Sequence, residues 1–283
     1  MAELLRAMTK DGSARALIIN SRDIVNKAIQ IHHTSPTATA ALGRTLSAAA
    51  LMGSIMPERD DLLTLRFKGD GNDYSGNVRG FIENPCVDLP LKATGKLDVS
   101  SCVGHGQLFV LRDTGNKQPY VGVSNIVSGE IAEDIAAYYA SSEQIPTLCA
   151  LGVLVDVDLS CLASGGVLIQ LLPFADPQII EKLEKNIKNL PPLTELLTKN
   201  TTENILSLYL NGIEFDVFDK IECGYVCPCN RERTEKALIS LGKYELMNMI
   251  EQDGKAELSC HFCEKKYNFS RNQLIALAKE AKV

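Results

Sequence analysis

Five cysteines lie near the C-terminus of the chain, and four of them form two closely spaced pairs. Cys227 and Cys229 are separated by one proline, Cys260 and Cys263 by two residues, and thirty residues lie between the pairs. Zinc accepts four thiolates in a tetrahedron at about 2.3 Å, and two short-spaced pairs can close on one such ion. The spacing therefore predicts a four-thiolate zinc site with these cysteines as ligands.

The spacing leaves the role of this site open. It is either a permanent structural zinc site or one that is lost when the thiolates are oxidised. The fifth cysteine, Cys223, is expected to be a bystander because the other four complete the tetrahedron, while the roles of alternative ligand and resolving thiol stay open. His261 is expected to face solvent, and His32 and His33 to be capping or surface groups at a helix end.

The composition favours a protein of a reducing, cytosol-like compartment. The 283 residues, 45% of them apolar, suffice for about two domains. The nine cysteines are an odd number, which argues against a secreted disulfide framework. Met1–Arg6 contains charged residues and no apolar segment of the kind that an export signal has. The apolar stretch Ala48–Met56 is too short to cross a bilayer. We therefore expect a cytoplasmic protein without a membrane partner, in which clustered cysteines indicate metal or redox chemistry.

Two other functions for the cysteine pairs fit the chain less well. A nucleic-acid binder needs a basic face, whereas the net charge is −6 and residues 223–283 hold ten Lys and Arg against eight Asp and Glu. A thiol oxidoreductase using Cys260 and Cys263 would need a βαβ setting, which the sequence does not indicate. No Gly-x-x-x-x-Gly-Lys-Ser/Thr phosphate loop is present, and no catalytic residues are predicted.

Residues 1–177 are predicted to form an α+β domain, in which helices are set apart from runs of strands. Ser35 and Pro36 form an N-cap and N1 pair, which opens an alanine-rich helix over 37–52 suited to close packing against a sheet. Glycine and proline residues mark the turns that separate the other elements. The expected strands are 13–20, 61–68, 77–82, 107–112, 120–127, 148–159 and 167–174, and the other expected helices are 22–32 and 130–142.

Residues 178–222 are predicted to form a linker of short helices broken by Pro191 and Pro192. The first helix carries an apolar stripe with charged residues on the opposite face. Helices this short are marginal alone in water, so the order of the linker must depend on packing against something else. The stripe consists of Ile179, Ile180, Leu183, Ile187 and Leu190.

Residues 223–283 are predicted to form a small zinc-binding domain. Asn230 can cap a helix, and segments 255–260 and 265–269 read as a hairpin whose loop holds the second cysteine pair. Ser270 begins a capping box that opens the last helix. A domain with so few core residues usually needs a metal staple.

At these residues the sequence closely resembles the 33 kDa chaperonin family of redox-regulated heat-shock holdases. The Cys-x-Cys and Cys-x-x-Cys pairs match that family's zinc signature, and the likeness covers nearly the whole chain. One departure is segment 69–76, where the family usually has a Gly-Gly-Pro-type loop, and Cys223 also lies outside the signature. Other stretches that carry the resemblance are 41–46, 128–134, 142–147, 229–233, 237–242 and 258–263.

The resemblance implies an ATP-independent stress-response chaperone, not an enzyme. It implies an inactive reduced form that holds one Zn²⁺ on Cys227, Cys229, Cys260 and Cys263, which are also the redox-active cysteines. Oxidation with unfolding stress would form disulfides, expected between Cys227 and Cys229 and between Cys260 and Cys263, release the zinc and loosen the linker. The exposed apolar surface would hold unfolded or oxidatively damaged client proteins for ATP-dependent refolding chaperones. The activated form would be a homodimer that binds neither nucleic acid nor membranes.

Overall fold

The computed structural model describes the chain except residues 59, 72–75, 79–81, 88, 116–117, 174 and 282–283. It divides into two compact units, Met1–Tyr225 and Val226–Val283. The sheets are antiparallel, and the helices are separate elements rather than crossovers between parallel strands. This arrangement confirms the predicted α+β class. No helix in the described parts of the chain combines the length and hydropathy that a bilayer span requires.

The first unit is built on a five-stranded antiparallel sheet that is covered on both faces. Its strand order is β7-β8-β2-β1-β9. Side chains alternate between the two faces, so that Leu17 and Ile19 belong to one buried cluster and Ala16 and Ile18 to another. The strands are β1 (Ala2–Thr9), β2 (Ala14–Asn20), β7 (Thr147–Val155), β8 (Cys161–Leu171) and β9 (Phe215–Cys223).

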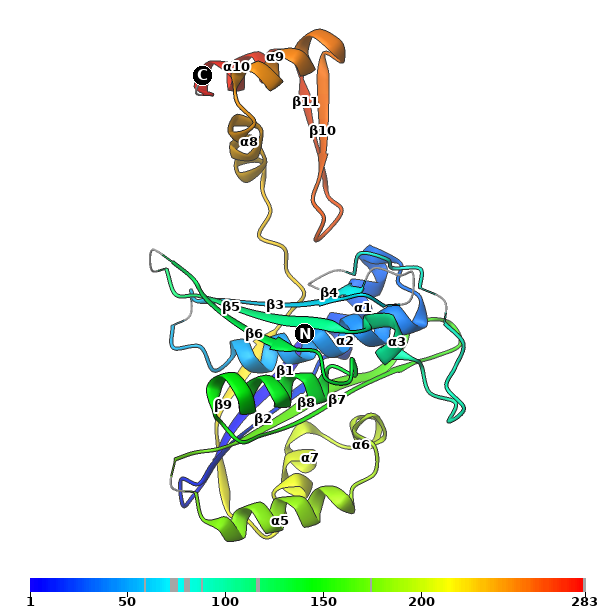
Figure 1. The fold of residues 1–283 in the computed structure, drawn as a ribbon, viewed down its shortest axis with the longest axis vertical. Helices are drawn as coiled ribbons and strands as arrows, with labels where there is room; N and C mark the ends of the chain where they lie inside the picture. Colours follow the sequence, from blue (N-terminus) through cyan, green and yellow to red (C-terminus); the bar gives the residue numbers. More distant parts are fainter. Residues whose placement is uncertain are drawn as a thin grey trace. The chain divides into compact units, whose positions relative to one another are not determined.

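A second antiparallel sheet has four strands in the order β4-β3-β5-β6. Helix α2 lies between the two sheets (Figure 1), and its Leu42 and Leu51 share a buried cluster with Phe67 and Leu108 of the second sheet. These strands are β3 (Leu62–Gly69), β4 (Gly76–Val78), β5 (Gly106–Asp113) and β6 (Tyr120–Asn125). The helices associated with this layer are α1 (Arg22–His32), α2 (Pro36–Gly53), α3 (Val99–Val103), α4 (Ala132–Tyr138) and the π-helical turn η1 (Tyr139–Glu143).

The start of α2 follows its sequence signal. The Ser35 side chain accepts a hydrogen bond from the Ala38 amide at 3.3 Å, and Pro36 occupies the first helical turn. Small side chains such as Ala40 and Ala41 are almost fully buried, which lets the helix approach both sheets closely.

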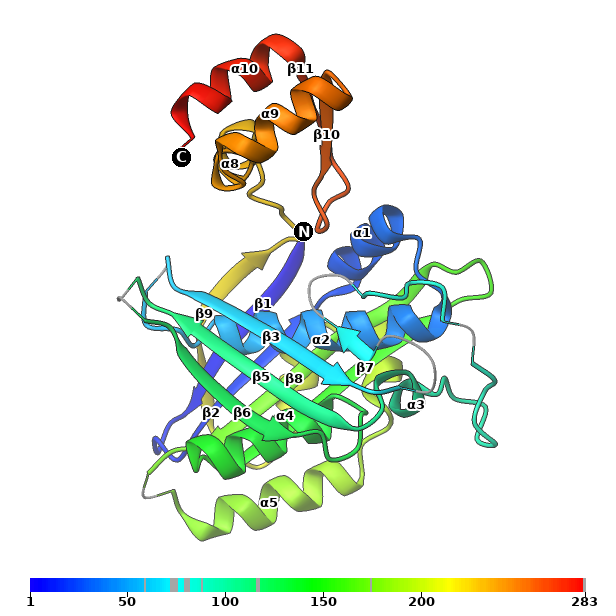
Figure 2. The same cartoon turned by 45° about the horizontal axis from the view of Figure 1, so that its top comes forward.

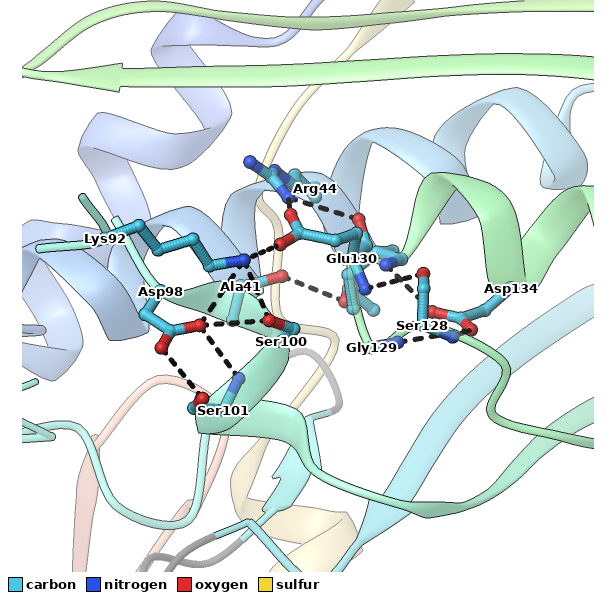
Figure 3. Close-up of polar contacts among 12 residues, drawn as sticks. Ala41, Arg44, Lys92, Asp98, Ser100, Ser101, Ser128, Gly129, Glu130 and Asp134 are labelled. Carbon is cyan, nitrogen blue, oxygen red and sulfur yellow. Dashed lines mark hydrogen bonds and ion pairs between the residues drawn. The ribbon is translucent and has the colours of Figure 1, made fainter. Parts of the chain in front are cut away.

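A network of ion pairs holds the segments around α2 together (Figure 3). The Glu130 carboxylate pairs with Arg44 of α2 and, at 2.6 Å, with the Lys92 ammonium, which also lies 3.5 Å from Asp98. The buried Asp134 carboxylate accepts hydrogen bonds from the backbone amides of the turn that leads into α4, Val127 and Ser128 at 2.7 and 2.9 Å and Ile131 at 2.9 Å. Because each carboxylate has several donors, we assign this network a structural role.

Three short helices cover the other face of the five-stranded sheet (Figure 1). Leu183, Leu196 and Ile205, one from each helix, share a buried cluster with Leu5 and Ile18 of the sheet. The helices are α5 (Pro177–Lys188), α6 (Leu193–Lys199) and α7 (Thr202–Tyr209).

The predicted stripe of α5 is only partly buried. Ile179 and Leu183 are buried, and Ile187 and Leu190 pack against the same cluster, whereas Ile180 is 40% exposed. The stripe residues other than Ile180 therefore make the contacts between this segment and the sheet.

The second unit holds a small core of its own. Leu246, Phe269 and Leu274 are buried at the centre of a cluster formed by three helices and a hairpin. Asn230 caps α8, and Ser270 forms a capping box with Gln273 at the start of the last helix, both as predicted. The elements are α8 (Arg231–Ser240), α9 (Lys243–Gln252), β10 (Lys255–Ser259), β11 (Lys266–Ser270) and α10 (Arg271–Glu280).

Four elements were not anticipated from the sequence: β1, α3, β9 and α9. Most important is β9, because it makes the last part of segment 178–222 a strand that pairs antiparallel with β1, from Ala2 opposite Cys223 to Thr9 opposite Phe215. The expected strand 77–82 is observed as Gly76–Val78, with 79–81 outside the described residues. Of the unusual loop 69–76, residues 72–75 also lie outside them.

Candidate metal centre

The four predicted ligands meet in the second unit. The Sγ atoms of Cys227, Cys229, Cys260 and Cys263 all lie within 4.8 Å of one another. The closest pairs are Cys227 with Cys260 at 3.6 Å and Cys229 with Cys263 at 3.3 Å. A tetrahedron of sulfurs at about 2.3 Å from zinc has edges of about 3.8 Å, which these separations match. The cluster therefore fits one metal ion held by four sulfurs.

Two tight backbone segments position the sulfurs. Cys227 and Cys229 lie directly before α8, where the carbonyl of Pro228 accepts a hydrogen bond of 3.4 Å from the Arg233 guanidinium. Cys260 and Cys263 lie in the turn between β10 and β11. That turn is closed by the Cys260 amide bonding to the Lys265 carbonyl at 3.0 Å.

Tyr267 on β11 adds a hydrogen bond that sequence analysis missed. Its hydroxyl donates to Sγ of Cys229 at 3.1 Å and, with the neighbouring Cys263, lowers the pKa of the Cys229 thiol to about 7. Burial raises the pKa of Cys227 to about 12 and also raises that of Cys263. Because the thiolate is the form that binds metal and reacts with oxidants, a lowered pKa favours the form of Cys229 that can do either.

Comparison with known proteins decides the family. The family model described as Hsp33 protein matches residues 2–270. The chain belongs to the Hsp33 family. Among relatives, the 33 kDa chaperonin of Acetivibrio thermocellus is 45% identical over 98% of this chain and 96% of its own length, and that of Clostridioides difficile is 42% identical over 98% of both.

The solved structures agree with this assignment. The crystal structure of the 33 kDa chaperonin (heat shock protein 33 homolog) from Thermotoga maritima is similar at a TM-score of 0.88, with 36% identity over 98% of both chains. The resemblance read from the cysteine motifs is thus confirmed, and the protein is a heat-shock chaperone by family.

The remaining cysteines lie outside the sulfur cluster. Cys223 ends β9 in the first unit, where burial raises its thiol pKa. Cys102 and Cys161 are fully buried and burial raises the pKa of each to about 11, whereas Cys86 is exposed. Within the described residues the candidate metal group does not include Cys223, and its expected role as a bystander stays a prediction.

A second contact missed from the sequence lies just before the Hsp33 cysteine cluster. Tyr225, two residues before Cys227, has its hydroxyl 2.7 Å from Nε2 of His32, and the two rings meet edge to face. His32 is therefore a buried partner of Tyr225 rather than a surface group, while His33 caps α1 in a left-handed conformation. The contact holds the end of the first unit on α1.

Disulfide mapping should identify which sulfurs pair on oxidation. We expect bonds between Cys227 and Cys229 and between Cys260 and Cys263, because the backbone already holds each pair together when the metal leaves. The shortest sulfur contacts, Cys227 with Cys260 and Cys229 with Cys263, define the competing result. Peptide mass mapping of the oxidised protein separates the two patterns. A dominant bond to Cys223 would instead make that residue part of the redox chemistry.

Proposed function

We propose that this protein is a redox-regulated, ATP-independent holdase. In the proposed cycle the reduced form binds one Zn²⁺ through Cys227, Cys229, Cys260 and Cys263 and is inactive. Oxidation converts the four thiolates into two disulfides, releases the ion and loosens the linker 178–222. The single observation that carries the proposal is the cluster of four sulfurs within 4.8 Å in a chain of the Hsp33 family.

The chemistry of the proposed switch balances with a peroxide as oxidant. Each disulfide forms from two thiolates, which give up two electrons to one hydrogen peroxide, and two protons are taken up to yield two waters. Disulfide sulfurs have lost the charge that binds zinc, so the ion leaves as the second bond forms. Bound zinc supplies folding free energy on the order of 10 kcal/mol to a small domain, and oxidation removes it.

Packing of the linker helices supports the second half of the proposal. Each of α5–α7 has at most 12 residues, too few for a stable isolated helix in water. Ile205 and Leu206 are fully buried, and Leu183 is 6% exposed. At roughly 25 cal/mol per Å² of apolar surface, this burial is what keeps the helices ordered. Loosening them would uncover the apolar face of the five-stranded sheet.

Strand β9, the last part of the linker, connects the cysteine unit to the linker helices α5–α7. It is the edge strand of its sheet and joins α7 to Tyr225 and then to Cys227. Glu3 of β1 ties this region together: its carboxylate accepts hydrogen bonds from Lys220 at 2.6 Å and from Thr202 at 2.9 Å. Once the cysteine unit unfolds, Tyr225 is expected to leave His32, and β9 can separate from β1 starting at Cys223.

The proposed partners follow from the proposed activity. Clients are unfolded or oxidatively damaged proteins, which ATP-dependent chaperones would refold afterwards. We further propose three regions, 1–177, 178–222 and 223–283, a homodimeric active form and a cytoplasmic location. No nucleic acid or membrane takes part in the proposed cycle.

The test measures zinc content and suppression of client aggregation together. Reduced protein purified without chelator should contain one zinc per chain and leave client aggregation unchanged. After peroxide treatment at elevated temperature, zinc should be lost and aggregation suppressed, with or without ATP. The Cys86→Ser variant, which removes an exposed thiol outside the cluster, should behave like the wild type. Suppression that requires ATP, or activation with zinc fully retained, would refute the proposal.

A further inference from the structure

A cavity of about 640 Å³ lies in the first unit, between residues of its two sheets. Its volume is in the range of small-molecule sites. The described residues that line it and carry the argument are Arg15 of β2, Arg112 of β5, Glu143 of η1, and Met52, Met56 and Leu63 of the α2–β3 region.

Arg15 is held in place by buried neighbours. It lies opposite Gln170 of β8, and its Nε donates a hydrogen bond of 2.7 Å to the Gln170 side-chain oxygen. Gln170 is fully buried, and its own amide donates to the Thr147 hydroxyl at 3.1 Å. The chain of hydrogen bonds fixes the guanidinium plane, while neither terminal nitrogen of Arg15 has a hydrogen-bond partner among the described residues. Such preorganisation favours binding of a planar anion.

No carboxylate among the described residues forms an ion pair with Arg15. Nearby arginines have their own partners: Arg112 lies 2.9 Å from Glu143, and Arg6 lies 3.3 Å from Asp219. Burial, together with the charges of Arg6 and Arg112, lowers the pKa of Arg15. A half-buried cation that lacks a counter-charge is unfavourable, and an anion bound in the cavity would relieve this.

Much of the remaining wall is apolar, and the polar residues Thr114 and Gln118 that also line the cavity are exposed. Met52 is buried, and Ile55, Met56, Leu63 and Ile145 are half-buried around the same space. Methionine side chains adapt to ligands of different shape. A ligand that satisfies both parts of the cavity has one anionic head and an apolar body.

We propose that this cavity binds a small amphipathic carboxylate, such as a medium-chain fatty acid, with the carboxylate on Arg15 and the tail along Met52, Met56 and Leu63. Arginine binds carboxylates through two parallel hydrogen bonds, which the two terminal nitrogens of Arg15 can supply. All the lining residues belong to the first unit, whereas the four clustered cysteines belong to the second. The proposed binding therefore does not rest on the proposed redox cycle.

Calorimetric titration of the full-length reduced, zinc-loaded protein with octanoate tests the proposal. Octanoate should bind with one site per chain. Acetate, which lacks the tail, and 1-octanol, which lacks the charge, should each bind at least about tenfold more weakly. Hexanoate should be weaker than octanoate by about tenfold, because two buried methylenes are lost. This ligand series uses the unaltered protein and needs no variant.

Two arginine variants locate the site. Arg15→Gln should weaken octanoate binding by about tenfold or more, since it removes a charge-assisted contact. The matched control is Arg6→Gln, which removes an arginine of the same sheet that already pairs with Asp219 and does not line the cavity, and it should bind as the wild type does. Absence of octanoate binding, equal binding of octanol, or equal weakening by both variants would each overturn the proposal.

Discussion

Removal of zinc from the reduced protein should unfold the unit Val226–Val283 and leave Met1–Tyr225 folded. The second unit buries only a small cluster around Leu246 and Phe269, and Cys229 packs against its edge. Cores of this size rarely supply more than about 3–5 kcal/mol, whereas four-thiolate zinc binding supplies on the order of 10 kcal/mol. The ion is therefore expected to contribute more stability than the apolar core.

Hydrogen exchange with and without a chelator, under reducing conditions, measures this effect. Amides of β10, β11 and α10 should be protected in the zinc-loaded protein and exchange freely after chelation, while β2 and β8 keep their protection. The Cys260→Ser/Cys263→Ser variant should resemble the chelated protein. Cys223→Ser, which alters a cysteine of the first unit, should retain zinc and protection. If β10 and β11 stay protected in metal-free protein, zinc is not the staple of this unit.

The parts of the fold that could be predicted are those with local signals. Ser35 and Pro36 mark the start of α2, and Ser270 with Gln273 marks α10, because capping depends on residues within one turn. Strands β1 and β9 pair across more than two hundred residues, Ala2 with Cys223, and no local pattern encodes such a partner. β9 is also an edge strand with exposed Val217 and Phe218, so it lacks the simple alternation of a half-buried strand.

The same distinction applies to the functional residues. The sulfur cluster was predictable because short Cys spacings restrict the sulfurs to one place, and the structure brings the candidate ligands Cys227, Cys229, Cys260 and Cys263 together. Tyr267 and the contact of Tyr225 with His32 were not predictable, because each depends on tertiary packing between separate elements. The half-buried charge of Arg15 is of this second kind, since its sequence neighbours do not reveal which cavity it lines.

Replacing Leu183 and Ile187 by Asp should produce a chaperone that holds clients while reduced and zinc-loaded. Leu183 is 6% exposed in the cluster beneath α5, and Ile187 packs against it. Truncating a buried leucine typically destabilises a protein by about 2–5 kcal/mol, and burying a carboxylate adds a desolvation penalty. A helix of 12 residues has little stability of its own to offset that loss, so α5 should leave the sheet. The uncovered face, with Ile18 and Ile169, would then be available to clients.

The matched control is Lys185→Gln/Lys188→Gln. It makes the same change of two negative units in net charge on the exposed face of α5 and leaves the apolar stripe intact. Hydrogen exchange should show residues 178–222 open in the aspartate variant and protected in the wild type and the control, with one zinc per chain in all three. Client aggregation should be suppressed by the aspartate variant alone. A variant whose linker exchanges freely but which holds no client would show that linker release is insufficient, and would place the client surface elsewhere in the molecule.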